Sequence, residues 1–330
     1  HCQIINIISN FSISKNMKKL ITLLLLVTTV VAVGQQNPPL PVDPKMRTGK
    51  LDNGLTYYIR QNGHPENRAD FYIAQKVGSM QEEDNQAGLA HFLEHMAFNG
   101  TTNFPGKTML NYLQDNGIKF GTNINAYTSF DETVYFISNI PTTNQNLVDS
   151  ALLVLYDWSC GIALEEEELE SERGVIREEW RTRGGAQQRL WDQLLPKMYP
   201  DSKYAKRMPI GSIDVINNFK PEEIRTYYHK WYRPDLQGII VVGDFDMDEM
   251  EQKVKELFSP IKLDNERAIR EYYPVPDNKE PIVAIASDKE ARNTQITIYY
   301  KHDAMPDELQ NTQMGYITKY IFEARAKDKR

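Results

Sequence analysis

The sequence predicts an α+β fold in which helices pack on a sheet. An Asn-Gly pair at Asn53-Gly54 stands before the strand-like residues 56–59, and this pair is the strongest short signal for a hairpin turn. Between residues 88 and 98, apolar side chains recur at helical spacing. Strand-like and helix-like segments then alternate along the chain, as expected when helices cover a sheet.

Each further element follows from its own pattern. A second strand is predicted at residues 71–77, and the helix at 88–98 carries Leu89, Phe92, Leu93 and Met96 on the face expected to pack on that sheet. The elements predicted after these are a helix beginning near Lys107, a strand at 133–137, a helix at 146–158, a long acidic helix at 164–183 and a strand at 238–245.

The first 34 residues are expected to lie outside the fold. Residues 1–16 precede the first methionine and are interpreted as upstream translation. Residues 17–34 have the pattern of a secretory signal peptide, with two lysines, an uncharged run of 14 residues and small residues before Gln35. That run spans about 21 Å as a helix, less than the roughly 30 Å of a bilayer core. We therefore expect a periplasmic or extracellular protein with no stable membrane span after cleavage.

The remainder divides into three predicted segments. Residues 35–263 are expected to form one complete domain, and the mixed charges and prolines of residues 264–280 indicate a linker. Residues 281–330 are expected to begin a second, related domain, with a strand pair at 281–287 and 294–302 followed by a helix. A segment of about 50 residues is too short to be stable alone as a domain of this kind.

Composition excludes several classes of protein. Of the 330 residues, 41% are hydrophobic and 25% are charged, which is ordinary globular usage and not that of a disordered chain. The net charge of −7 provides no basic face for nucleic acid. The two cysteines, Cys2 and Cys160, exclude a disulfide scaffold and a four-cysteine zinc module, and Cys160 is expected to be a buried apolar residue. Any metal site must therefore use histidines and carboxylates.

The string His91-Phe92-Leu93-Glu94-His95 on the predicted helix has the chemistry of a metal site. At 100° per residue, the two histidines and Glu94 project from one face. Two imidazoles at positions i and i+4 can bind one metal ion, and the neighbouring carboxylate can reach a metal-activated water, as zinc-assisted hydrolysis requires. Chance would produce the string about 0.015 times in such a chain. The order H-x-x-E-H is that of the inverzincins.

A third protein ligand is expected, since catalytic zinc usually has three. Glu172 and Glu179 lie seven residues apart on the acidic helix, so they share a face but are separated by about 10.5 Å along the axis. Both cannot bind the same ion, and the spacing alone does not decide between them. The acidic run at residues 165–168 is interpreted as a solvated helix face.

Several strings follow one another in unbroken order, at residues 78–101, 125–135, 172–179, 209–211, 232–234 and 241–245. Together they resemble the pitrilysin/insulinase (M16-type) family of zinc metallopeptidases, to which mitochondrial processing peptidase also belongs. The resemblance extends over residues 48–261, and the longer Phe-Asn-Gly-Thr and Glu-Glu-Trp-Arg segments resemble the bacterial secreted, PqqL-like branch of that family.

The resemblance implies a role for each matching residue. It implies one Zn²⁺ per catalytic domain, with His91 and His95 as ligands and Glu94 as the general base. Aligned on Glu-Arg-Gly-Val, the family pattern makes Glu179 the third ligand and Glu172 the supporting carboxylate of the catalytic set. Glu178 is the nearest rival, but it lies 100° off that helix face.

The resemblance also implies a fold and a mode of substrate binding. The complete unit would be like one domain of mitochondrial processing peptidase, a mixed and largely antiparallel sheet packed with helices. Asn125, Ala126 and Tyr127 would lie on an edge strand that pairs with an extended peptide substrate. Judged from the residues alone, Asn125 fits a turn equally well. In this family, a related second half closes on the catalytic half, so a C-terminal half or a related subunit is an expected partner.

The leading hypothesis is therefore a secreted zinc-dependent endopeptidase that hydrolyses peptides or small unfolded proteins. The alternative is a noncatalytic peptide-binding or assembly subunit of the same fold. The presence of Glu94 favours the enzyme, because a subunit that only binds peptides has no chemical need for a general base.

Overall fold

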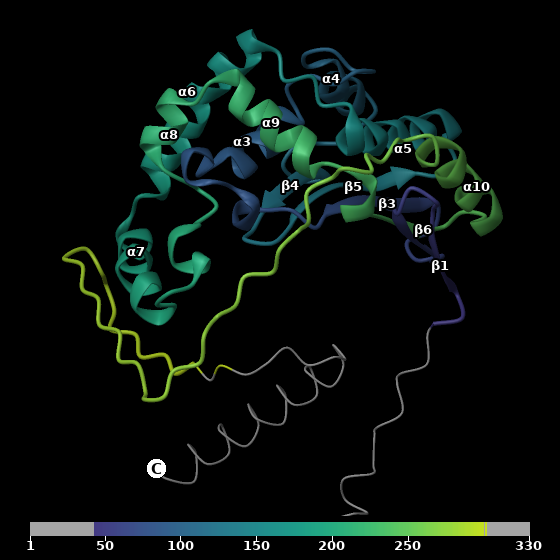
Figure 1. Ribbon diagram of the computed structural model, residues 1–330. Coiled ribbons are helices and arrows are strands. Elements are labelled where there is room, and N and C mark those ends of the chain that lie inside the picture. Colours follow the sequence, from purple (N-terminus) through teal and green to yellow (C-terminus); the bar gives the residue numbers. More distant parts are fainter. Residues whose placement is uncertain (1–42, 300, 302–330) are drawn as a thin grey trace, which may run out of the picture. The chain divides into compact units, whose positions relative to one another are not determined.

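A six-stranded sheet organises the part of the chain that the structure, a computed structural model, describes, which is residues 43–299 and 301 (Figure 1). The strand order is β1-β2-β6-β3-β5-β4. Only β2 and β6 pair in parallel among these strands, and the other four pairings are antiparallel. The strands are β1 (Met46–Lys50), β2 (Thr56–Gln61), β3 (Arg68–Gln75), β4 (Ile124–Thr128), β5 (Thr133–Pro141) and β6 (Gln237–Gly243).

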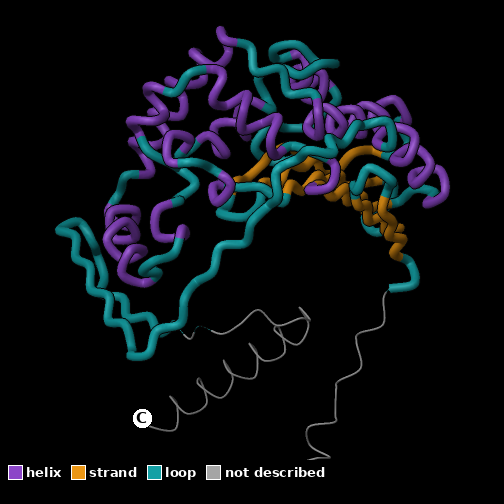
Figure 2. Tube along the Cα trace, viewed as in Figure 1, coloured by secondary structure: helices purple, strands orange, loops and turns teal. Residues whose placement is uncertain are grey.

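Helices gather over one face of this sheet, as Figure 2 shows. They are α3 (Leu89–Met96), α4 (Thr108–Asp115), α5 (Gln145–Cys160), α6 (Glu166–Arg183), α8 (Ile213–Asn218), α9 (Pro221–Trp231) and α10 (Met247–Phe258). Helix α7 (Ala186–Met198) lies to one side of the sheet, at the left of Figure 1. The short 3₁₀ turns are η1 (Ser79–Gln81), η2 (Asp84–Gln86), η3 (Lys203–Lys206) and η4 (Pro234–Leu236).

The core lies between the sheet and these helices because alternate strand residues point toward them. In β3, Ala69, Phe71 and Ile73 are buried, whereas the residues between them are only half-buried. Helix α5 packs on β3 and β5, and α3 packs beside β4 and α6. Trp158 of α5 is fully buried, and its indole N–H donates to the carbonyl of Ala97, just after α3. The core therefore fixes the end of α3 against the sheet.

Two interior contacts fix the beginning of α3. Gly88 precedes the helix with φ +106°, and a Cβ on the facing Gly211 would come within 2.2 Å of the Gly88 Cα, so the two backbones touch where only glycine fits. The buried Glu82 carboxylate accepts the Ala90 N–H at 2.8 Å. Burial raises the pKa of Glu82 to about 8.

The predicted fold class is confirmed, since the sheet is mixed and largely antiparallel. The Asn-Gly turn joins β1 to β2, with Lys50 opposite Thr56. The predicted strand at 71–77 begins earlier, at Arg68, and the other predicted elements within residues 88–245 are found with small shifts at their ends. The expectation for Cys160 is wrong, because this last residue of α5 leaves its thiol at the surface.

The predicted strand pair after the linker is also wrong for the residues described. Residues 261–299 contain no helix or strand, and Ile282, Val283 and Ile296 are exposed there. A two-stranded ribbon needs a covering element to bury its apolar face. In the described part of the chain, α7 bonds to this segment through polar groups, Arg189 with Asp288 and Lys197 with the Ile285 carbonyl, and these apolar side chains stay exposed. The upstream segment, the signal peptide and the terminal helix were expected at residues 1–34 and after 302, outside the described residues.

Candidate metal centre

Helix α3 brings its two histidines to one side. His91 and His95 lie one turn apart, their ring centroids are 4.8 Å from each other, and the rings are nearly perpendicular. His91 is 5% exposed because the helix packs with Leu89, Phe92, Leu93 and Met96 in the core. The two imidazoles therefore occupy a partly closed position at the edge of the core.

Helix α6 supplies the facing carboxylate. Glu179 Oε2 lies 3.2 Å from His95 Nε2 and 3.7 Å from His91 Nε2. One ligand atom from each of the three residues falls within 4.8 Å of the others. The donor set of two imidazole nitrogens and one carboxylate oxygen is one that catalytic zinc uses, with a position left for water. These residues therefore fit a zinc ion.

Packing of α6 on α8 determines where Glu179 stands. The buried Arg173 side chain donates to the carbonyl oxygens of Ile216 and Phe219, and its guanidinium lies 4.2 Å above the Phe219 ring. Arg183, one turn after Glu179, pairs with the carboxylate oxygen Oε1 that faces away from the histidines. Glu179 Oε2 is therefore the oxygen directed at the imidazoles.

Glu172 contacts the Nδ1 side of the His95 ring, whereas Glu179 faces the Nε2 side. Its Oε1 is 2.8 Å from His95 Nδ1, and its Oε2 accepts from Asn99 Nδ2 at 2.6 Å. Burial would raise the pKa of Glu172, but the hydrogen bonds from His95 and Asn99 bring it below its usual value. A carboxylate in this place fixes the ring of a ligating histidine and increases its basicity.

Charge in the cluster is divided unequally between the two histidines. Burial lowers the pKa of His91 to about 4, so its ring is neutral. Burial would do the same to His95, but the carboxylates of Glu172 and Glu179 raise its pKa to about 9. The hydrogen bond with His95 in turn lowers the pKa of Glu179 to about 2. A cation at this position is thus electrostatically favoured.

Glu94 lies on the same helix and points toward β4. Its side chain is nearly buried, and burial raises its pKa above the usual value. Thr128 Oγ1, at the end of β4, donates to Glu94 Oε2 at 2.6 Å. A carboxylate of raised pKa held by one oxygen has the properties of a general base.

The predicted substrate residues lie on β4, the outermost strand on one side of the sheet. Asn125, Ala126 and Tyr127 pair with β5 along one edge of this strand, so Asn125 is a strand residue and not a turn residue. The Asn125 side chain accepts the Ala126 N–H at 2.9 Å, and Tyr127 is 46% exposed.

The rival carboxylates lie away from the cluster. Glu178 is exposed and pairs with Arg181 at 2.6 Å. The acidic run at residues 165–168 is largely exposed in the first turn of α6, as expected of a solvated helix face.

Three residues that contact the predicted carboxylates of the site were not themselves predicted as site residues. Thr128 holds Glu94, Asn99 holds Glu172, and Arg183 holds Glu179. Only Arg183 had a usable signal, because it lies four residues after a candidate ligand on the same helix. The other two depend on elements that approach from distant parts of the sequence.

Two family profiles match the chain. The one described as insulinase (peptidase family M16) matches residues 57–208, and the one described as peptidase M16 inactive domain matches residues 218–325. The protein named "Probable zinc protease PqqL" of Escherichia coli is 37% identical over 286 residues, which cover 86% of this chain and 30% of that protein.

Solved structures share the fold. The crystal structure of the first half of the periplasmic protease PqqL from Escherichia coli has a TM-score of 0.69 and 38% identity, covering 73% of this chain and 51% of that one. The crystal structure of a protease from Helicobacter pylori has a TM-score of 0.62 and 29% identity, covering 70% of this chain and 55% of that one.

Helix α3 carries two histidines and a carboxylate, and it faces a glutamate of α6 and lies beside the edge strand β4. This arrangement places the chain in the class of metallopeptidase-like α+β units. The chain belongs to peptidase family M16, the insulinase family, whose zinc proteases imply a zinc cofactor. The matched region spans 30% and 27% of the lengths of two curated PqqL proteins. No helix among the described residues has the length and apolar character to cross a bilayer.

Proposed function

We propose that this chain carries the catalytic unit of a zinc-dependent endopeptidase that hydrolyses peptides or small unfolded proteins. The observation that carries the proposal is the approach of His91, His95 and Glu179 within 4.8 Å, from helices far apart in the sequence. His91, His95 and Glu179 would hold one zinc ion.

Zinc, when bound, supplies a Lewis acid that polarises the scissile carbonyl and makes water a better nucleophile at neutral pH. Glu94 then acts as the general base. Thr128 engages Glu94 Oε2, which leaves Oε1 to take a proton from the attacking water. Because burial raises the Glu94 pKa, the same carboxyl can hold that proton and deliver it to the leaving amine.

The substrate would bind as an added strand on the free edge of β4. Asn125, Ala126 and Tyr127 would offer this edge, and Thr128 at its end adjoins Glu94. Pairing there requires the Ala126 N–H to exchange its bond to the Asn125 side chain for a substrate carbonyl. Strand addition selects extended backbone, which favours peptides and unfolded chains over folded proteins.

A second structural unit, either a C-terminal half or a related subunit, would close on the bound peptide. Support comes from relatives that are about three to four times as long as the matched region, including the periplasmic PqqL. An opposing wall would hold the peptide near zinc, and such positioning contributes several kcal/mol to catalysis, by analogy with the roughly 7–11 kcal/mol of well-oriented reactions. The same relative and the leader-like residues 17–34 support a periplasmic or extracellular location.

The test combines metal analysis with hydrolysis of a quenched, unstructured peptide, using this chain alone and with the second half of a family member added in trans. We expect one zinc per chain and cleavage that requires both zinc and Glu94. Zinc binding without Glu94-dependent cleavage under either condition would favour a noncatalytic peptide-binding subunit.

A further inference from the structure

The two histidines of the cluster differ in the hydrogen-bond partner of their Nδ1 atoms. The buried His91 Nδ1 has no hydrogen-bond partner among residues 43–299. His95 Nδ1, in contrast, is 2.8 Å from Glu172 Oε1. Since zinc would bind Nε2, the proton of neutral His95 must lie on Nδ1, and Glu172 is the group that keeps it there.

Glu172 is itself held by a second residue. Asn99 is 4% exposed, and its Nδ2 donates to Glu172 Oε2 at 2.6 Å. Lys107 Nζ donates to the other end of the same amide, Asn99 Oδ1. Because an ammonium only donates and a carboxylate only accepts, a single orientation of the amide satisfies both neighbours. The Asn99 amide therefore holds the Glu172 carboxylate in place, and that carboxylate in turn orients the His95 ring.

The backbone around Asn99 is anchored independently of Glu172. The Asn99 N–H donates to the carbonyl of Met96 at 3.0 Å. A few residues later, Thr101 Oγ1 and the Asn103 N–H donate to the buried Asp157 of α5 at 2.5 and 2.9 Å. These contacts hold the loop that carries Asn99 independently of Glu172 and of the histidines, as a positioning group requires.

We propose that Asn99, oriented by Lys107, is a positioning residue of the metal centre: it holds Glu172 so that His95 keeps its Nδ1 proton and directs Nε2 at the metal. This rests on the proposed zinc site. Loss of an outer hydrogen-bond partner typically costs about 10–100-fold in metal affinity. Asn99 should fall in this range although it touches neither the metal nor the substrate.

The test measures zinc affinity by competition with a chelator, for the unmodified chain and two variants. Asn99→Asp keeps the shape but places a second carboxylate against Glu172, and Asn99→Ala removes the amide without adding charge. We expect a loss of about 10–100-fold for Asn99→Asp and a smaller loss in the same direction for Asn99→Ala. Asn146→Asp, at an exposed position in the first turn of α5, is the matched control and should bind zinc as the unmodified chain does.

A spectroscopic measurement separates positioning from a general loss of structure. The zinc-loaded chain should show a slowly exchanging His95 Nδ1 proton in the downfield NMR spectrum, and Asn99→Asp should broaden or remove this signal while circular dichroism stays unchanged. If Asn99→Asp fails to fold, Asn99→Ala decides by the same two measurements. Unchanged zinc affinity and an unchanged Nδ1 signal in a folded Asn99 variant would overturn the role. A lack of zinc in the unmodified chain would instead overturn the proposed function.

Discussion

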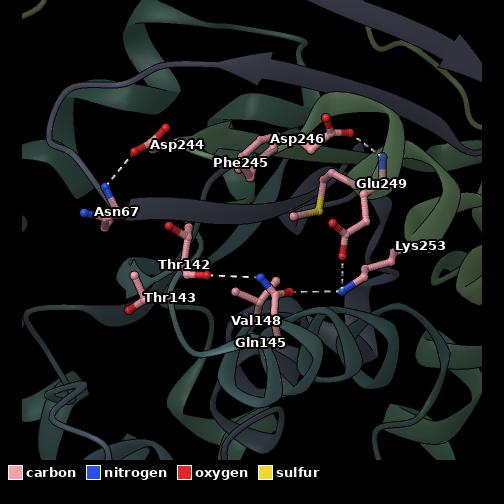
Figure 3. A pocket seen from close by; sticks show the side chains of 11 residues that line it. Asn67, Thr142, Thr143, Gln145, Val148, Asp244, Phe245, Asp246, Glu249 and Lys253 are labelled. Atoms are coloured by element: carbon pink, nitrogen blue, oxygen red, sulfur yellow. Dashed lines mark hydrogen bonds and ion pairs between the residues drawn. The ribbon is translucent and has the colours of Figure 1, made fainter.

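The two ends of the sheet use their polar residues in different ways. At the end where β5 begins, groups from α3, α6 and β4 converge so that lone pairs of His91, His95 and Glu179 face one point. At the other end, beyond Pro141 and Gly243, lies a hollow of about 350 Å³ between the starts of α5 and α10 (Figure 3).

The polar groups of the hollow are occupied by local bonds. Asp244 accepts the Asn67 N–H at 2.8 Å, and Asp246 caps α10 by accepting the N–H groups of Asp248 and Glu249. Lys253 pairs with Glu249, as Figure 3 shows, and their charged atoms are 3.1 Å apart. The proposed reactive site is therefore marked by the convergence of donor atoms from separate elements and not by the size of a cavity.

The largest expected effect is at the converging end. His91→Ala should abolish stoichiometric zinc, because two remaining protein ligands hold the ion poorly. The loss should exceed the roughly 10–100-fold expected for an outer partner. Metal analysis after dialysis measures this. His229→Ala, at an exposed histidine of α9, is the control, and equal zinc in both variants would contradict the site.

The next effect separates metal binding from catalysis. Glu94→Gln keeps the shape of the side chain and its contact with Thr128 but removes the base. Zinc content should stay the same, while peptide turnover should fall by roughly 10²–10⁴-fold. Turnover per bound zinc, measured beside the exposed Glu178→Gln, provides the comparison. Undiminished turnover would remove Glu94 from its proposed role.

A third series ranks the carboxylates of α6. Glu179→Gln should cost the most zinc affinity, Glu172→Gln about 10–100-fold, and Glu178→Gln nothing measurable. The order follows from the distances, since Glu179 faces both Nε2 atoms, Glu172 faces only Nδ1 of His95, and Glu178 pairs with Arg181. Chelator competition measures all three, and a different order would reassign the ligand.

A smaller effect concerns folding and pH. The Glu82 pKa of about 8 lies above its ordinary value of 4.5, so between these values the folded chain keeps a proton that the unfolded chain has lost. Stability should therefore fall as pH rises through this window, by at most roughly 1.4 kcal/mol per pH unit. Glu82→Gln retains an acceptor for Ala90 and should lack this component. Thermal unfolding at pH 5 and 8.5 with chelator present tests this, and parallel pH profiles would contradict it.

The smallest effect is expected at the hollow. Lys253→Met removes ion pairs with Asp149 and Glu249 that lie at the surface, and it should change the free energy of unfolding by less than about 1 kcal/mol. Zinc affinity and turnover should not change. A marked loss of zinc affinity or turnover would mean that the two ends of the sheet are coupled, and it would contradict the view that the polar groups of the hollow act only locally.

Elements with a local signal could be predicted from the sequence. The helix that carries His91 and His95 follows from apolar spacing within one segment, and the Asn-Gly turn needs only four residues. The strand β1 was missed because it is short and carries a glycine among polar residues, so it has no clear alternation. The helices α7 to α10 were left unassigned. Interior polar contacts such as Thr128 with Glu94 could not be predicted, because they join residues 34 positions apart.

The helix phase left Glu172 and Glu179 as alternatives, and only the family resemblance ordered them. In the structure, Glu179 faces the Nε2 side of the histidines. Glu172, two turns earlier on α6, faces the Nδ1 side of His95. Their roles as ligand and support stay predictions. The strand pair after the linker failed because an alternating pattern says nothing about what will cover the strands.

The position of β6 has a consequence for the order of assembly. This strand lies between β2 and β3, yet it is translated after both helices that bear the histidines and Glu179. Among the described strands, only β6 pairs with both the β1-β2 hairpin and the β3-β5-β4 sheet. Until Gln237–Gly243 has been synthesised, these two parts therefore have no ladder hydrogen bonds that join them. Pairing of such distant segments slows folding. A nascent chain therefore carries all the proposed zinc ligands before it has the sheet that would hold them, and it acquires a rigid site only when its central strand is inserted.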